Sequence, residues 1–514
     1  MSAQAPPLPA GFGIAFDPAT EVVGSDVLFG GSPPRLLRLN AAGQRALAEL
    51  RGGQVRSAAG GTLARRLTDT GLAHPRPPAQ EPAGRAGARE VTVVIPVRDR
   101  PAGLDTCLSA LAGSYPVIVV DDGSLDAAAV ATACAKHGAC LVRRPEPAGP
   151  GQARNDGLAR AATPLIAFLD SDCAAGPEWI AALAGHFADP LVAAAAPRVV
   201  AKPGHGLASR YMSARAPLDM GPQESRVLPL TRVSYVPTAA LLVRRAALTT
   251  ATAAEGTSPA ALSVPARGSG LAPAPVGTFD PDLRYGEDVD LIWRLTGAGW
   301  RVRYDPSAVV CHCDPEGWPA LLARRFRYGR SAAPLARRHP GHVPSLVVQA
   351  WPGAVTAALL ARKPATALAA YGLGTWQLAA LLRGWGVPPT GILRPMAESV
   401  LQTWLGTGRW SVQFALPVVA AALAQPGAGH PGQARLRLGR RAALASLLIG
   451  PPVAEWLRSR PDMGVLAFAA CYLADEAAYG AGVYQGSLTE RLATPLLPRL
   501  APRPLQKADP HPEH

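Results

Sequence analysis

Val91-Thr-Val-Val-Ile-Pro-Val97 is a run of mostly β-branched residues that ends in the polar turn Arg98-Asp-Arg100. Two similar runs follow, at 117–120 before Asp121-Asp-Gly-Ser124 and at 164–169 before Asp170-Ser-Asp172. We expect helices over the segments between these runs, at 104–112, 127–137 and 151–162. Strands that alternate with helices predict an α/β fold with a mostly parallel sheet, whose ligands bind beyond the carboxyl ends of the strands. The acidic residues lie at that edge.

Four motifs in a fixed order extend this pattern. They are Val120-Asp-Asp-Gly-Ser124, Gly151-Gln-Ala-Arg-Asn155, Leu169-Asp-Ser-Asp172 and Gly286-Glu-Asp288. One Asp-x-Asp alone is common on solvated turns, but four motifs in register are specific. Over roughly residues 89–329 the chain therefore resembles the family 2 glycosyltransferases, which have the GT-A nucleotide-sugar-binding fold.

Size, cysteine content and charge restrict the number of domains, the cellular compartment and the kind of partner. A chain of 514 residues is too long for a single hydrophobic core, so we expect two or three domains. Seven cysteines with no C-x-x-C pair favour a reducing compartment. The net charge of +14 is concentrated at 321–514, which hold 21 Lys and Arg against 8 Asp and Glu. Without a groove of basic and aromatic residues, we expect no nucleic-acid partner.

The resemblance to family 2 implies a donor site for a UDP-sugar. Asp122, at the end of the second strand, takes the position of the family's aspartate that accepts the N3–H of uracil. Pro96 and Arg98, at the end of the first strand, would form the other wall of that pocket. Arg154 would hold the ribose or the phosphates, and Asp170 would face the ribose or the metal ion.

Asp170 and Asp172 predict a metal site, because two carboxylates at one strand end suit a hard divalent cation such as Mg²⁺ or Mn²⁺. The resemblance adds His312, from Val309-Val-Cys-His-Cys-Asp314, as a third ligand. Two alternatives remain for His312, namely a buried structural histidine and a soft Cys-His-Cys metal site. In a strand Cys311 and Cys313 would point away from His312, which favours the ligand role that the resemblance implies.

Glu287 and Asp288 precede 289–295, an amphipathic segment that we expect to be a helix. The resemblance assigns Asp288 as the general base that takes the proton from the acceptor hydroxyl, which gives inversion at the anomeric carbon. Glu287 is the second candidate. Carboxylates are also favoured at a helix N-terminus by the helix dipole, so either one has a purely structural alternative.

Residues 1–76 are predicted to form a small α+β domain. Its hairpin turns at Gly30-Gly-Ser-Pro-Pro34, Asn40 caps one helix, and a second helix ends before Gly71. This pattern resembles the PqqD-like peptide-chaperone domains, winged-helix modules that bind a peptide as an added strand. A generic α+β cap is the alternative. Residues 77–89 have the composition of a linker.

Two segments lie beside the catalytic motifs. The Ala-, Pro- and Ser-rich stretch at 249–275 is predicted to be a disordered insertion, either an inert loop or a lid over the acceptor cleft. Arg324, Arg325 and Arg327 are candidates to close over the diphosphate, as an arginine-bearing helix does in processive family members. The Gln-x-x-Arg-Trp form of those members is absent from this sequence.

The region 331–514 is rich in Ala and Leu, basic, and predicted to be helical. Its long uncharged runs favour association with the cytoplasmic face of the cell membrane, through weak spans or through interfacial helices with arginines on anionic lipid. A soluble helical bundle is the alternative.

The order of the three regions resembles the mycofactocin-system glycosyltransferases. That resemblance implies transfer of glucose from UDP-glucose to premycofactocin or a related acceptor, a redox cofactor made from a ribosomal peptide. One rival is a membrane-associated transferase that makes lipid-linked or cell-wall glycan from a UDP-sugar. Another is a binding protein without catalytic activity, which would leave the complete set of metal and base residues without a purpose.

Overall fold

The computed structural model describes residues 5–24, 26–78, 90–249, 272–313, 317–383, 385, 390–424 and 431–501. The chain forms two compact units. Unit 1 comprises Met1–Lys202 and Ala216–Asp314, and unit 2 comprises Pro203–Arg215 and Pro315–His514. Most of the predicted linker at 77–89 and of the predicted insertion at 249–275 lies outside the described residues. The predicted domain boundaries near 76 and 330 stay predictions.

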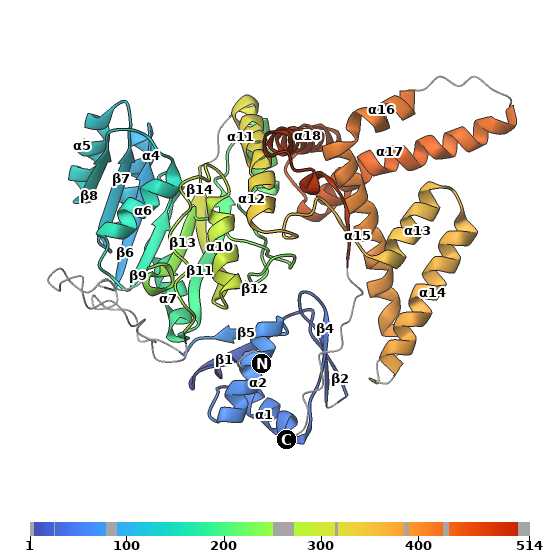
Figure 1. The fold of residues 1–514 in the computed structure, drawn as a ribbon, viewed down its shortest axis with the longest axis horizontal. Coiled ribbons are helices and arrows are strands. Elements are labelled where there is room, and N and C mark those ends of the chain that lie inside the picture. Colours follow the sequence, from blue (N-terminus) through green and yellow to red (C-terminus); the bar gives the residue numbers. More distant parts are fainter. Residues whose placement is uncertain are drawn as a thin grey trace. The chain divides into compact units, whose positions relative to one another are not determined.

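A mixed sheet of nine strands organises unit 1 (Figure 1). Its strands are β6 (Val91–Val97), β7 (Val117–Asp122), β8 (Cys140–Arg144), β9 (Leu165–Leu169), β10 (Cys173–Ala174), β11 (Val192–Ala201), β12 (Ser225–Arg226), β13 (Ala240–Arg244) and β14 (Arg301–His312). Their order is β10-β14-β11-β13-β9-β6-β7-β8, and β12 pairs with β14. Strands β9, β6, β7 and β8 are parallel neighbours, whereas β13 runs antiparallel between β9 and β11.

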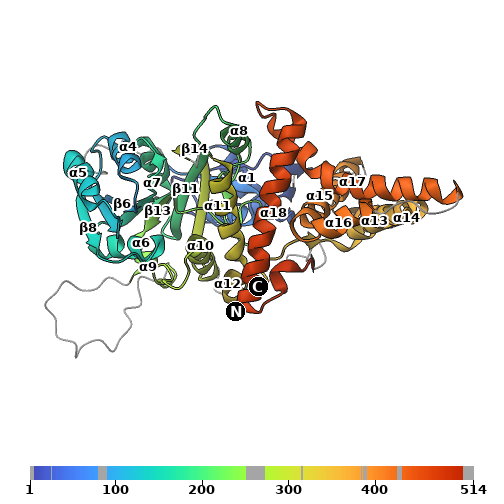
Figure 2. The same cartoon turned by 90° about the horizontal axis from the view of Figure 1, so that it is seen from above.

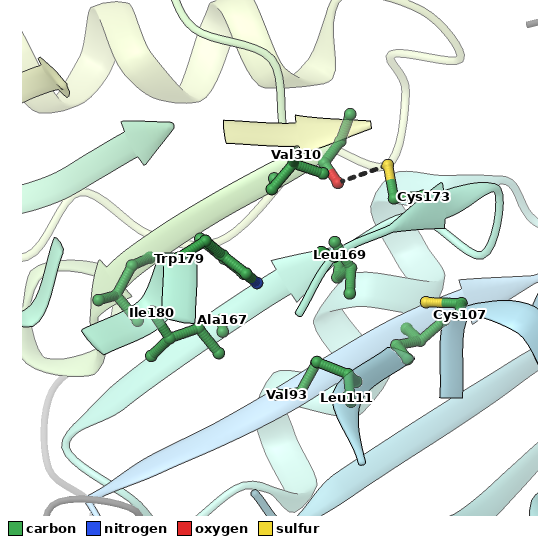
Figure 3. Close-up of a cluster of buried hydrophobic side chains, with 14 of the residues drawn as sticks. Val93, Cys107, Leu111, Ala167, Leu169, Cys173, Trp179, Ile180 and Val310 are labelled. Carbon is green, nitrogen blue, oxygen red and sulfur yellow. Dashed lines mark hydrogen bonds between the residues drawn. The ribbon is translucent and has the colours of Figure 1, made fainter. Parts of the chain in front are cut away.

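Helices cover both faces of this sheet (Figure 2). One face carries α4 (Pro101–Leu111), α5 (Ala127–His137) and α7 (Glu178–Ala184), and the other carries α6 (Pro150–Arg160) and α10 (Glu287–Gly297). The short helix α9 (Arg245–Leu248) follows β13. Side chains from α4 and α7 meet the strands in a buried apolar cluster, shown in Figure 3. The predicted α/β fold with a mostly parallel sheet is confirmed.

The sequence explains why α6 packs so closely on the sheet. Strand β6 is buried along its whole length, as expected for a β-branched run covered on both faces. A Cβ atom at Gly157 of α6 would lie 2.3 Å from Cγ1 of Val94, so a larger residue there would displace Val94 or the helix. This close approach brings the start of α6 to the carboxyl ends of the strands.

The N-terminal part of unit 1 has its own hydrophobic core. Its elements are β1 (Gly13–Phe16), β2 (Glu21–Val23), β3 (Val27–Gly30), β4 (Arg35–Arg38), α1 (Ala41–Arg51), α2 (Ala58–Thr70) and β5 (Ala73–Arg76). Asn40 caps α1 by accepting the N–H of Gly43, and α2 ends at Gly71 in the left-handed conformation, both as predicted. The likeness to PqqD-like domains stays a prediction.

Buried ion pairs fix this N-terminal part to the large sheet. Arg65 of α2 donates two hydrogen bonds to Asp189, at 2.7 and 2.8 Å, and both side chains are at most 4% exposed. Asp69, one turn further along α2, accepts two hydrogen bonds from Arg301 of β14. A bidentate pair of this kind sets orientation as well as proximity. The two parts of unit 1 therefore form one body.

Unit 2 is helical. Its elements are α8 (Leu207–Ala214), α11 (Trp318–Arg330), α12 (Ala332–Arg338), α13 (Ala350–Leu360), α14 (Pro364–Arg383), α15 (Thr390–Phe414), α16 (Leu416–Ala424), α17 (Pro431–Ser459) and α18 (Val465–Glu490), with a small parallel pair of strands, β15 (Val347–Val348) and β16 (Arg499–Leu500). A Cβ atom at Gly482 of α18 would lie 2.0 Å from the carbonyl oxygen of Phe326. Glycine there allows α11 and α18 to touch backbone to backbone.

Charged groups are buried in the centre of unit 2. Asp475 and Glu476 of α18 pair with Arg215, which follows α8, and Asp475 also accepts a hydrogen bond from Arg325 of α11. Both carboxylates are almost fully buried, so these partners offset the loss of hydration. The guanidinium of Arg325, a sequence candidate for binding the diphosphate, is thus committed to Asp475.

One helix in the described part of the chain, α14, is long and apolar enough to cross a membrane. Its mean hydropathy of 1.2 is at the threshold for such a helix, and 17% of its most apolar window is buried. Leu368 and Trp376 on this helix are 73% and 63% exposed. The predicted association with a membrane stays a prediction.

The ion pair between Arg65 and Asp189 gives a test of this architecture. Asp189→Ala should lower the free energy of unfolding by about 3–5 kcal/mol, because it leaves a buried guanidinium without its partner. Urea unfolding followed by tryptophan fluorescence measures the loss. The matched control is Asp26→Ala, which removes an exposed partner of Arg38 and should cost less than about 1 kcal/mol. If both variants lost the same free energy of unfolding, the Arg65–Asp189 ion pair would not contribute as a buried pair should.

Candidate active site

The carboxyl ends of β6 and β7 form one wall of the candidate site. Asp122, 4% exposed, accepts the backbone N–H groups of Ala148 and Gly149, at 2.9 and 2.8 Å. The backbone N–H of Asp99, after β6, donates a hydrogen bond to the Ser124 hydroxyl oxygen, which ties the two strand ends together. Asp122 thereby holds the turn that leads into α6, a role that the sequence did not indicate.

Arg154 of α6 joins two acidic elements. Its Nη1 donates to Oε1 of Glu287 at 2.8 Å, and its Nη2 donates to Oδ1 of Asp170 at 2.7 Å. Burial alone would lower the pKa of the guanidinium, but the charges of Asp170 and Glu287 outweigh burial and raise it. Arg154 is 3% exposed and stays charged. Its predicted contact with ribose or phosphate stays a prediction.

Glu287 and Asp288 begin α10, where Gly286 takes a left-handed conformation with φ of 81°. Burial and then the charge of Asp288 raise the pKa of Glu287 to about 7. Burial also raises the pKa of Asp288, against the opposing hydrogen bond from the N–H of Val289. Two neighbouring carboxyl groups therefore hold protons more tightly than usual, a property common among catalytic acids and bases.

Asp170 and Asp172 follow β9, and the pairing of β10 with β14 brings His312 beside them. The Nε2 atom of His312 lies 3.3 Å from Oδ1 of Asp172, and Arg100 pairs with Oδ2 of the same carboxylate. Burial alone would raise the pKa of Asp172, but the hydrogen bond and charge of His312, followed by Arg100, lower it. The lowered pKa keeps the Asp172 carboxyl group ionised, which is the form that binds a metal ion.

The donor set at this position fits a divalent cation. Asp170 and Asp172 would supply oxygen atoms and His312 would supply a nitrogen, a combination that Mg²⁺ and Mn²⁺ accept. Within the described ranges, no three His, Cys, Asp or Glu side chains stand as a ready metal cage. The side chain of Arg100 is about half exposed and occupies Asp172, so this arginine would have to leave when a cation binds.

The fold brings most of the predicted site residues to one edge of the sheet. Pro96, within β6, is buried, while the side chain of Arg98, just beyond that strand, is half exposed. Asn155 exchanges hydrogen bonds with the backbone of Phe279 and so ties α6 to the segment before α10. Sequence reasoning missed Arg100, although the turn Arg98-Asp-Arg100 directly after β6 was a usable signal. The individual roles of these residues stay predictions.

The chain is similar to known proteins both within its catalytic segment and along almost its whole length. A family model described as glycosyl transferase family 2 matches residues 92–249. The pre-mycofactocin glycosyltransferase of Mycobacterium tuberculosis is 35% identical over 520 aligned residues, which cover 96% of this chain and 98% of that protein. Glycosyltransferase AglE of Haloferax volcanii is 26% identical over 47% of this chain and 72% of its own length.

Among solved structures, a mannosyltransferase of Pyrobaculum calidifontis in complex with GDP-mannose and Mn²⁺ is similar to this chain. The two are 18% identical, the match covers 73% of this chain and 89% of the other, and the TM-score is 0.35. The S. aureus protein TarS, residues 1–349, is 15% identical with a TM-score of 0.34, over 70% of this chain and 92% of that one.

The raised pKa of Glu287 can be observed directly. Because its value of about 7 lies above the ordinary 4.5, this carboxyl group should stay protonated in mildly acidic solution and ionise only near neutrality. A pH titration of the chain labelled with ¹³C at the glutamate carboxyl carbons should show one resonance that shifts near pH 7. Glu287→Gln should remove that resonance. A spectrum in which all glutamates titrate close to 4.5 would contradict the geometry of this pair.

Proposed function

The chain belongs to the family of pre-mycofactocin glycosyltransferases, with a family 2 catalytic domain of the GT-A fold, and from this premise we propose that it transfers glucose from UDP-glucose to pre-mycofactocin with inversion. The observation that carries the proposal is the likeness to the M. tuberculosis protein along almost the whole of both chains. The N-terminal part and unit 2 are included in that likeness. A match confined to the catalytic domain would point equally to transferases that act on lipids or glycans.

Asp288 is the proposed general base, and the contacts of its neighbour support this choice. Glu287 is held by Arg154 at 2.8 Å and is 7% exposed, so its carboxylate is engaged in holding α6 to α10. The Asp288 carboxyl group pairs with backbone groups, among them the N–H of Val289, and the residue is half-buried. Its raised pKa makes it a better proton acceptor once ionised. It would take the proton as the acceptor oxygen bonds to the anomeric carbon and the bond to the diphosphate breaks.

Asp122 and Asp170 are the proposed donor contacts. A carboxylate has about four acceptor positions, so Asp122 keeps capacity for the N3–H of uracil beside its two backbone hydrogen bonds. The second oxygen of Asp170 has no hydrogen bond to Arg154 and would face the ribose or a cation. Pro96 and Arg98 would complete the wall of the base pocket, and the ordering of Asp122 by Ala148 would keep this pocket preformed.

Asp170, Asp172 and His312 would hold Mg²⁺ or Mn²⁺, which neutralises the negative charge that builds up on the leaving diphosphate. Arg100 would remain beside this position after it leaves Asp172. Its half-exposed guanidinium would then accompany the diphosphate as it departs. In this proposal Arg100 pairs with Asp172 before the metal ion binds and with the diphosphate afterwards.

We also propose that the protein works at a membrane surface. The exposed Leu368 and Trp376 of α14, in a region rich in arginine, suit a helix that lies at the lipid interface. Interfacial binding brings the enzyme to the cytoplasmic face of the cell membrane without requiring that any helix span it.

Mass spectrometry tests the proposed reaction. The purified chain with Mn²⁺, UDP-glucose and pre-mycofactocin should add hexose masses in series to the acceptor. Asp288→Asn should reduce transfer by about 10²–10⁴-fold, because the neutral amide cannot accept the proton. Chelation of the metal should abolish transfer, and its return should restore it. Hydrolysis of UDP-glucose without transfer would move the acceptor search to lipids and glycans, and unchanged transfer by Asp288→Asn would contradict the assigned base.

A further inference from the structure

Arg100 lies beside the proposed metal-binding turn because helix α4 approaches that turn closely. A Cβ atom at Gly103, in the first turn of α4, would lie 3.1 Å from the carbonyl oxygen of Ser171. Glycine at this position therefore lets the start of α4 contact the turn that carries Asp170 and Asp172. Arg100 directly precedes α4, and its Nη1 atom donates a hydrogen bond to Oδ2 of Asp172. The packing of α4 thus places this arginine within reach of the carboxylate.

The backbone before Arg100 is fixed, whereas its side chain is half exposed. Asp99 has a φ of 55°, in the left-handed region that residues other than glycine seldom adopt. Its backbone N–H donates to the Ser124 hydroxyl, and its carboxylate accepts the N–H of Leu125 at 2.8 Å. The Arg100 side chain makes no hydrogen bond that caps α4. It can therefore exchange one anionic partner for another without a change in the backbone.

Both carboxylate oxygens of Asp172 are engaged. Oδ2 accepts from Arg100, and Oδ1 lies 3.3 Å from Nε2 of His312. A divalent cation that binds Oδ2 has to displace Arg100, and the positive guanidinium repels any cation at this carboxylate. The diphosphate of a nucleotide-sugar is an anion whose oxygens a guanidinium binds well. It can therefore draw Arg100 away from Asp172.

We propose that Arg100 couples the two ligands of the candidate active site, so that the divalent cation binds weakly until the donor diphosphate is present. This inference rests on the proposed function, which supplies both the cation and the diphosphate. Without a diphosphate, Arg100 competes with the cation for Asp172. With a diphosphate, Arg100 pairs with phosphate oxygens, and Asp172 becomes available to the cation. Because coupling between two ligands is reciprocal, the cation strengthens donor binding by the same factor.

Titration of the full-length chain with Mn²⁺ tests this coupling without any turnover. Electron paramagnetic resonance measures the free ion, and each titration is run with and without UDP. Arg100→Gln should bind Mn²⁺ alone at least about threefold more tightly than the wild type, because the competing cation is gone. The factor by which UDP tightens Mn²⁺ binding should fall at least about threefold. The factor that remains in the variant measures the direct attraction between Mn²⁺ and the diphosphate.

Two further variants separate the contact from the net charge. Arg100→Lys keeps a positive charge beside Asp172 and should bind Mn²⁺ like the wild type, because the hydrogen bond uses a single nitrogen. Arg160→Gln removes the same charge from the exposed end of α6 and should also leave Mn²⁺ binding unchanged. Wild-type affinity and coupling in Arg100→Gln would overturn the proposal and leave the proposed metal site standing. A wild-type chain that bound no Mn²⁺, with or without UDP, would overturn the metal site and the coupling together.

Discussion

The candidate site depends on one buried cation. Arg154 receives its position from α6, which packs on β6 through Gly157, and it binds Asp170 after β9 and Glu287 at the start of α10. Without this guanidinium, the three carboxyl groups of Asp170, Glu287 and Asp288 would lie near one another without the cation that Asp170 and Glu287 share. Their mutual repulsion would favour protonation and separation. Arg154 therefore allows acidic residues from distant parts of the sequence to share one edge of the sheet.

The same arrangement gives the neighbouring carboxyl groups of Glu287 and Asp288 different environments. Glu287 is buried against Arg154 and fixes the start of α10, which also fixes the position of Asp288. Burial raises the pKa of both residues, that of Glu287 to about 7, which is a common feature of acid and base catalysts. In the proposed mechanism, Glu287 gives structural support and its neighbour Asp288 transfers the proton.

Much of the fold could be predicted, because β6, β7 and β9 are continuous apolar runs that end in polar turns. The strand β11 could not, since its alanine-rich centre has neither β-branched residues nor a period of two. The ion pair between Arg65 and Asp189 also could not be predicted, because the two residues are far apart in the chain and no local sequence pattern indicates that they meet. Within the site, motif order located Asp170, Asp172 and Asp288, whereas the bridging role of Arg154 and the contact of Arg100 with Asp172 depend on tertiary packing.

A crystal structure of the chain with Mn²⁺ and UDP would test the central role of Arg154 most directly. Our account predicts that the guanidinium still bridges Asp170 and Glu287 in the complex, while Arg100 has left Asp172 and the cation contacts Asp172 and His312. An Arg154 side chain that has moved from Glu287 onto the ribose or the diphosphate would contradict it. The arginine would then be a donor contact, and the organisation of the carboxyl groups would need another explanation.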